Sequence, residues 1–209
     1  KQRSTDNSPE GGGPAADAWK KHFAGQVPAA AVFVNAVAFF ETTDPVYAHK
    51  LTSMGLTQYP ADGEIAARLG RLYGLTILGA KGMDRLGRVA AFDEDAAASE
   101  AADAARRELE GTRNANLLAG AGDVISWQTS TLRMRGRTAK AAELSDLAEH
   151  YLERACKLDS SSEQATGALR RHYQMAASTA RDASRTLELL EKAAAVPAEA
   201  EWTATPSSR

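Results

Sequence analysis

Small and aromatic residues recur 34 positions apart in the first third of the chain, and this interval is the strongest constraint on the fold. Ala36 precedes Gly70 by 34 residues, and Phe39 precedes Tyr73 by the same interval. A fixed period of this length is typical of repeated supersecondary units that bury their apolar faces against one another. Small side chains let helix axes approach closely, and aromatic side chains fill the space between neighbouring units. We therefore expect a series of similar units.

These units are expected to be helical. Apolar residues follow helical periodicity almost throughout, and no stretch alternates convincingly as a strand. Alanine, the strongest helix former, accounts for 43 of the 209 residues. Asp44, Asp62 and residues 160–162 supply N-caps, and Pro45 suits a first helical position. The expected helices span residues 15–24, 28–41, 45–59, 63–78, 93–109 or 95–109, 114–134, 139–158, 163–177 and 180–195.

Further small residues and a closing proline complete the first repeat. Ala48 and Gly55 lie on its second expected helix, and Pro60 ends that helix. The whole pattern resembles the tetratricopeptide repeat (TPR), a helical hairpin with small and aromatic residues at these positions. The resemblance implies an all-α, right-handed solenoid of about four helical hairpins. Its repeats would begin near Ala29, Gly63, Ala115 and Glu163.

The later repeats follow the same pattern less closely. Residues 148–159 match a second helix of the family, and Tyr173 supplies the aromatic residue of the next hairpin, but Arg170 replaces the expected small residue. The alternative is an alanine-rich helical bundle without regular repeats. In either case we expect one helical domain at residues 15–196, with a flexible polar tail at 1–14 and a second tail at 197–209.

The spacing of the repeats is irregular, which indicates two insertions. Gly70 and Gly122 are 52 residues apart, about 18 more than one period, and the interval from Gly122 to Ala148 is about 14 residues too long. Inserted loops on a repeat scaffold often bind partners, although solvated loops that bind nothing are the alternative. The candidate binding residues in these insertions are basic. They are Arg85 and Arg88 in the first insertion, and Arg133, Arg135 and Arg137 in the second.

The family resemblance also implies a concave groove, lined by the first helix of each hairpin, that receives a peptide. The groove positions in this sequence are Phe33, Val37, Phe40, Arg71, Asp123 and Arg171. Phe33 and Val37 replace the lysine and asparagine with which some family members hold a C-terminal carboxylate. An apolar floor flanked by arginines favours an apolar ligand of acidic character. Alternatively, Trp19 and Phe23 cover the apolar face as an N-terminal cap.

No pattern of residues indicates catalysis. The four histidines lie on different expected helices, and none belongs to a helical metal motif. Asp146 and His150, four residues apart, are more typical of a solvated contact than of a metal site. Cys156 is the single cysteine, which excludes an internal disulfide and a cysteine-based zinc cluster. We therefore expect no enzyme activity, no cofactor and no metal.

Charge and hydropathy narrow the class of partner. A net charge of -2 gives no bulk attraction to nucleic acid or to anionic membranes. No apolar run approaches the roughly 20 residues that a membrane span needs. The composition favours a soluble protein, and a cytoplasmic one is expected, with a removed upstream segment before Lys1 as the alternative.

The sequence therefore predicts a non-enzymatic scaffold of the TPR type that holds a protein or peptide in a concave groove. Stacked repeats present an extended surface, which suits binding more than chemistry. The alternative is a helical protein that binds a small ligand or assists transport in the cell envelope. A deep closed pocket would favour this alternative, whereas an open groove would favour the scaffold.

Overall fold

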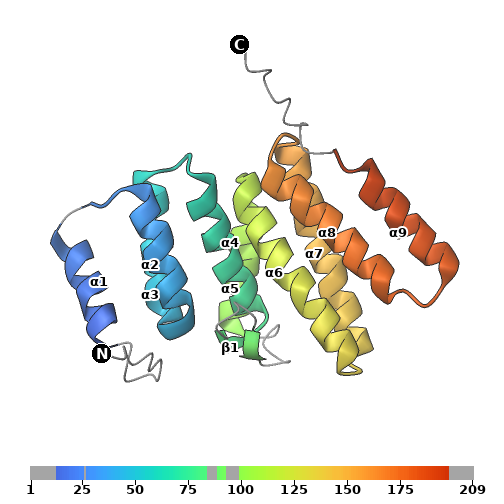
Figure 1. Ribbon diagram of the computed structural model, residues 1–209, viewed down its shortest axis with the longest axis horizontal. Coiled ribbons are helices and arrows are strands. Elements are labelled where there is room, and N and C mark those ends of the chain that lie inside the picture. Colours follow the sequence, from blue (N-terminus) through green and yellow to red (C-terminus); the bar gives the residue numbers. More distant parts are fainter. Residues whose placement is uncertain (1–12, 26, 84–88, 93–98, 198–209) are drawn as a thin grey trace, which may run out of the picture. The chain divides into compact units, whose positions relative to one another are not determined.

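The computed structural model describes residues 13–25, 27–83, 89–92 and 99–197 (Figure 1). Over these residues the chain forms nine helices and one pair of short strands, which confirms the all-α class. The elements in chain order are α1 (Gly13–Gly25), α2 (Ala30–Thr43), α3 (Pro45–Gln58), α4 (Gly63–Ile77), β1 (Ala80–Met83), β2 (Val89–Phe92), α5 (Glu100–Gly111), α6 (Ala115–Met134), α7 (Thr138–Leu158), α8 (Glu163–Thr179) and α9 (Ala183–Ala195).

Local capping residues determine where most of these helices begin. In each case a side-chain oxygen accepts a hydrogen bond from a backbone N–H of the first turn. Without the cap, that N–H has no partner within the helix. The expected caps are confirmed for three helices, namely Asp44 for α3, Asp62 for α4 and Ser162 for α8. Asn114, the residue at which the sixth helix was expected to begin, is the cap of α6.

Two helices begin later than expected. The cap of α5 is Ser99, whose Oγ accepts from the N–H of Ala102 at 3.2 Å. The predicted starts at Asp93 and Asp95 lie outside the described residues. Helix α9 begins at Ala183 rather than at residue 180, because Asp182 caps it.

The chain divides into two compact units, unit 1 at residues 1–112 and unit 2 at residues 113–209. Unit 1 contains the hairpins α2–α3 and α4–α5, and unit 2 contains α6–α7 and α8–α9. The predicted repeat starts agree with the first residues of α2, α4, α6 and α8, to within one residue for α2.

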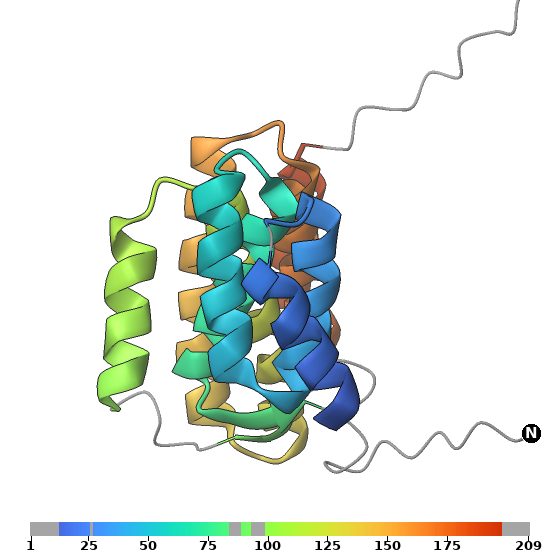
Figure 2. The ribbon, with the colours of Figure 1, turned by 90° about the vertical axis from the view of Figure 1, so that its left-hand side faces the viewer.

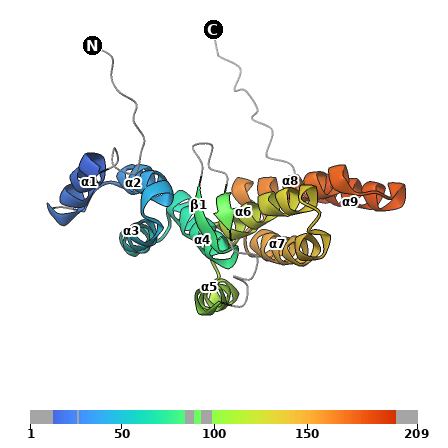
Figure 3. The same ribbon diagram turned by 90° about the horizontal axis from the view of Figure 1, so that it is seen from below.

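Unit 1 is held together by α4, which packs against α2, α3 and α5. Figures 2 and 3 show α1 and α5 on opposite sides of the unit. One apolar cluster consists of Phe33, Val34 and Ile65, and Phe23 and Tyr59 pack against it. The Tyr59 hydroxyl also donates to the carbonyl of residue 28 at 3.0 Å, which ties the end of α3 to the start of α2.

In unit 2, α7 packs against both α6 and α8, and lies below them in Figure 3. Helices α6 and α8 run side by side in the same direction. Three polar contacts between them join residues that are 46 positions apart, which shows that the two helices stay in one register over most of their length. These contacts are Asn116–Ser162, Ser126–His172 and Arg133–Thr179, each 2.9 Å long.

The constant separation of 46 residues between contacting positions of α6 and α8 shows where the second predicted insertion lies. It is not a loop, as the sequence analysis expected, because only residues 135–137 separate α6 from α7. Instead, α6 and α7 contain 20 and 21 residues, whereas α2 and α3 contain 14 each. The additional residues lengthen both helices of the hairpin.

Small residues allow close approach both within a hairpin and between successive hairpins, as the repeat pattern predicts. A β-carbon at Gly122 would lie 2.6 Å from Cγ of Leu152, so α6 and α7 approach at this point too closely for any side chain. A β-carbon at Gly55 would lie 3.1 Å from Cγ2 of Ile65 on α4. Ala48 is also fully buried.

The first predicted insertion contains an element that its residue pattern does not indicate. Strands β1 and β2, of four residues each, pair as an antiparallel hairpin that follows α4. Gly79 precedes β1 with a φ of 63°, a left-handed conformation that favours glycine and turns the chain out of α4. Strands this short do not produce a recognisable alternation of apolar and polar residues.

Candidate functional site

The three apolar residues predicted to line a groove lie in the core of unit 1. Phe33, Val37 and Phe40 are all buried, with at most 1% of each residue exposed. A partner therefore has no access to them in this structure. Their assignment to an open groove is corrected accordingly.

Helix α1 explains part of this burial. The Phe23 ring lies 5.0 Å, centroid to centroid, from the Phe33 ring, in an edge-to-face arrangement. Lys20 pairs with Asp44 at 3.4 Å, and its ammonium lies 5.2 Å from the centroid of the Tyr47 ring. The structure thus favours the alternative in which an N-terminal helix covers this face, with Phe23 making the contact.

Arg71, predicted as a groove cation, faces a carboxylate of its own unit. Its Nε lies 3.6 Å from Oε2 of Glu41, and Nη1 of Arg68 lies 3.6 Å from Oε1 of the same carboxylate. Glu41 is only 4% exposed. Burial raises the pKa of Glu41 against the opposing effect of the two arginines. The charge of Arg71 therefore serves mainly to compensate a buried acid.

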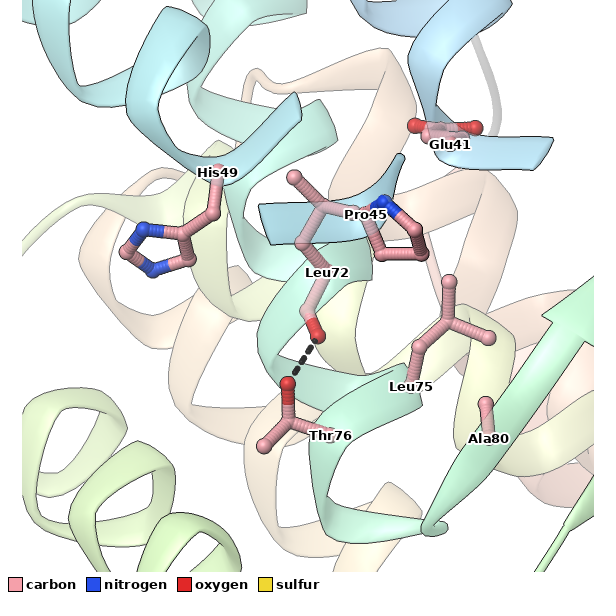
Figure 4. A pocket seen from close by; sticks show the side chains of 7 residues that line it. All are labelled: Glu41, Pro45, His49, Leu72, Leu75, Thr76 and Ala80. Atoms are coloured by element: carbon pink, nitrogen blue, oxygen red, sulfur yellow. Dashed lines mark hydrogen bonds between the residues drawn. The ribbon is translucent and has the colours of Figure 1, made fainter. Parts of the chain in front are cut away.

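A small pocket adjoins Glu41 (Figure 4). Its volume is about 70 Å³, far below the roughly 300–1,000 Å³ of ordinary ligand pockets. In Figure 4, Glu41 and His49 lie at opposite ends of the pocket, with Leu72 between them. Burial lowers the pKa of His49. The pocket suits ordered water better than an organic ligand. Its lining consists of Glu41, Pro45, His49, Leu72, Leu75, Thr76 and Ala80.

In unit 2 the structure brings two predicted groove residues together. Nη2 of Arg171 on α8 donates to Oδ1 of Asp123 on α6 at 3.0 Å. Half of the Arg171 side chain and about a third of the Asp123 side chain are exposed (50% and 29%). This pair lies on the accessible surface of the α6–α8 pair, where a partner can reach it.

The same surface contains two large apolar residues that the sequence analysis missed. Trp127 is 55% exposed and Met134 is 80% exposed. They follow Asp123 by four residues and by eleven, so the helical period places all three on one side of α6. We call Asp123, Trp127, Met134 and Arg171 the α6–α8 surface. A count in helical steps from Asp123 would have found Trp127.

The basic residues of the predicted insertions do not form one loop cluster in the described part of the chain. Arg133 belongs to the last turn of α6, where its Nη1 donates to Oγ1 of Thr179 at 2.9 Å. Arg135 and Arg137 are exposed in the turn between α6 and α7. Arg85 and Arg88 lie outside the described residues.

Unit 2 also contains a cavity of about 250 Å³ lined by α7, α8, α9 and the end of α6. His172 is part of its lining and is only 2% exposed. Its Nδ1 lies 2.9 Å from Oγ of Ser126, and burial lowers its pKa. The cavity is lined by Arg133, Ala142, Ser145, Asp146, Glu149, His172, Ala176, Thr179, Ala180, Arg185 and Leu189.

Hydrogen bonds engage Glu149, one of the charged residues that line this cavity. Nζ of Lys192 lies 2.9 Å from Oε1 of Glu149, and the Tyr173 hydroxyl donates to the same oxygen at 3.2 Å. Burial alone would raise the pKa of Glu149, but these two hydrogen bonds hold it below its usual range. Burial and the nearby carboxylates raise the pKa of Tyr173. Glu149 is therefore an ionised, fully engaged group.

Neither a metal cluster nor a membrane span is found in the part of the chain that the structure describes. Within the described ranges, no three histidine, cysteine, aspartate or glutamate side chains gather closely enough to hold a metal ion. None of the described helices combines the length and the apolar character needed to cross a bilayer. Cys156 is a half-buried thiol that packs against the core of unit 2, and burial raises its pKa.

Comparisons with known proteins assign the chain to no family. No protein-family model, no curated protein and no solved structure matches it. Its function must therefore be argued from the sites described above.

Proposed function

We propose that this protein is a non-enzymatic scaffold of TPR-like hairpins that binds a protein or peptide partner on the α6–α8 surface. Two exposed apolar side chains beside an accessible ion pair suit protein recognition, because tryptophan and arginine contribute most to binding energy at interfaces. The exposure of Trp127 is the observation that carries the proposal.

The proposal also includes the architecture, in which the helical hairpins stack as those of tetratricopeptide repeats do. Within each unit the first helix of the second hairpin packs against both helices of the first hairpin, as expected for stacked repeats. Tyr73 and Tyr173 support this reading. The Tyr73 ring lies 5.1 Å from the His49 ring of α3, and the Tyr173 hydroxyl bonds to Glu149 and Glu153 of α7. Each tyrosine thus joins its own hairpin to the preceding one.

The chemistry of the α6–α8 surface indicates the kind of partner. Trp127 and Met134 favour an apolar side chain, which loses contact with water when it packs against them. Arg171 has five N–H donors, and its contact with Asp123 uses one of them. A carboxylate of the partner can therefore bind the same guanidinium. We propose a peptide segment that places an acidic residue beside an apolar one.

The test compares two exposed apolar residues of unit 2. Trp127 is 55% exposed and Leu187 on α9 is 59% exposed, so Trp127→Ser and Leu187→Ser remove similar accessible apolar groups from different surfaces. Partners would be cross-linked to the full chain in the cells that produce it and identified by mass spectrometry. We expect one partner to be retained by the wild type and by Leu187→Ser but lost with Trp127→Ser.

Binding of that partner would then be measured with purified proteins, together with thermal unfolding of each variant. Arg171→Gln should weaken binding and reduce its dependence on salt, because it removes a charge contact at a partly exposed surface. A partner that binds Trp127→Ser as tightly as the wild type would place the interface elsewhere and overturn the proposal.

A further inference from the structure

The cavity of unit 2 is surrounded by charged groups of both signs that come from different helices. Arg133 comes from the end of α6, Asp146 and Glu149 from α7, and Arg185 from α9, while His172 of α8 contributes a buried imidazole. All of these groups belong to unit 2, so the cavity is complete within one compact unit. Its volume of about 250 Å³ suits only a small molecule.

Two of the four charges are already balanced by neighbouring residues. Oε1 of Glu149 lies 2.9 Å from Nζ of Lys192. Nη1 of Arg185 lies 2.6 Å from Oε1 of Glu188. A charged ligand therefore gains little from Glu149 or Arg185, because it would have to displace an existing ion pair.

Arg133 and Asp146 are different. The guanidinium of Arg133 bonds only to the neutral hydroxyl of Thr179, and no ion pair within 4 Å joins it to Asp146 in the described part of unit 2. The charge of Asp146 nevertheless acts on it, since it opposes the lowering of the Arg133 pKa that burial causes. Both residues line the cavity, and Asp146 is exposed to solvent there while Arg133 is half-buried. The cavity thus presents one cation and one anion that are not joined in an ion pair.

We propose that this cavity binds a small zwitterion of amino-acid size, with its carboxylate at Arg133 and its ammonium at Asp146. Such a molecule places two opposite charges a few ångströms apart and can therefore bridge this pair. An organic ammonium is the cation proposed at Asp146, because one carboxylate can accept its N–H groups.

The rest of the lining indicates the ligand's remaining contacts. Ser126 engages Nδ1 of His172, which leaves Nε2 as the nitrogen available for a ligand. Ala176 and Leu189 give part of the wall an apolar surface, which favours a short aliphatic side chain. This site differs from the α6–α8 surface, so its test is independent of the proposed partner.

The experiment titrates the full chain with L-alanine, L-valine and L-leucine by isothermal calorimetry. Each amino acid is compared with its methyl ester, which lacks the carboxylate charge, and with its N-acetyl derivative, which lacks the ammonium. We expect at least one free amino acid to bind with a Kd of about 1 mM or tighter, a reasonable value for so few atoms. Both of its derivatives should bind at least about tenfold more weakly, a difference of about 1.4 kcal/mol.

Variants locate the site. Arg133→Gln and Asp146→Asn should each weaken binding about tenfold or more. Arg135→Gln is the matched control, because Arg135 lies two residues further on and does not line the cavity; this variant should bind like the wild type. Circular dichroism checks that each variant folds. Absence of binding by all three amino acids, equal binding of the ester or the acetyl derivative, or unchanged binding by folded Arg133→Gln would each overturn the proposal.

Discussion

The close approach of α6 and α7 at Gly122 makes a quantitative prediction. In Gly122→Ala, the new β-carbon would lie 2.6 Å from Cγ and 2.9 Å from Cδ2 of Leu152, and 3.2 Å from the Ala148 carbonyl oxygen. Because Cγ is the branch point of the leucine, rotation of its methyl groups does not relieve the clash. Overpacking costs about 1–3 kcal/mol, whereas alanine gains about 1 kcal/mol over glycine inside a helix. The two effects together give a net loss of up to about 2 kcal/mol.

Gly167 on α8 provides the matched control. The nearest atom to a β-carbon there would be Nη1 of Arg171 at 3.5 Å, an ordinary contact with a flexible side chain. Gly167→Ala should therefore keep the helix-propensity gain and stabilise the protein by about 0.5–1 kcal/mol. The same substitution is thus expected to have opposite signs at two positions in neighbouring first helices.

Urea unfolding followed by circular dichroism measures both effects, provided that the m-value does not change. A second variant tests the cause. Leu152→Ala should be less costly in the Gly122→Ala background than in the wild type, because it removes the side chain that clashes. A stabilised Gly122→Ala, or additive effects of the two substitutions, would show that α6 and α7 do not approach closely at this point.

Three further predictions concern buried groups. Burial raises the pKa of Glu41 above its ordinary value of 4.5, so above pH 4.5 the folded chain keeps a proton that the unfolded chain releases. Glu41 therefore makes the free energy of unfolding fall as the pH rises above 4.5. Glu41→Gln should reduce that fall in urea titrations between pH 4.5 and 7, and an unchanged pH dependence would contradict the raised pKa. Phe23→Ala should destabilise unit 1 by about 1–2 kcal/mol in thermal unfolding, because it removes a partly buried ring from Phe33; an unchanged Tm would show that α1 does not dock. Cys156 should react with a thiol reagent several-fold more slowly in the native protein than in urea, since it is half-buried with a raised pKa, and equal rates would refute this.

Features that depend on neighbouring residues in the sequence were predicted well. Asp44, Asp62 and Ser162 each bind an N–H three residues away, so the starts of α3, α4 and α8 follow from local chemistry. The contact between Asp123 and Arg171 follows from the repeat pattern, because equivalent positions of successive first helices are neighbours.

Features that depend on an element outside the pattern were predicted less well. For Phe33 the sequence left two alternatives, an open groove or a cover formed by Trp19 and Phe23. The repeat pattern does not decide between them, because it does not include α1, whose Phe23 packs against Phe33. The second insertion was expected as a loop, since an excess of residues between two landmarks does not show whether they extend a helix or a turn. Trp127 was not singled out from the sequence, because the groove positions that the family resemblance implies on α6 do not include residue 127.

The common register of α6 and α8 determines where unit 2 tolerates a change in length. The three contacts from Asn116–Ser162 to Arg133–Thr179 hold two segments of equal length side by side. One residue deleted between Asn116 and Arg133 would rotate the rest of α6 by about 100° and misalign the contacts beyond it. A deletion or insertion in the turns at residues 135–137 or 159–161 leaves all three pairs aligned and keeps α7 intact. Between Asn116 and Thr179, length variation among natural relatives, and the sites where a foreign segment can be grafted, should therefore concentrate in these two turns.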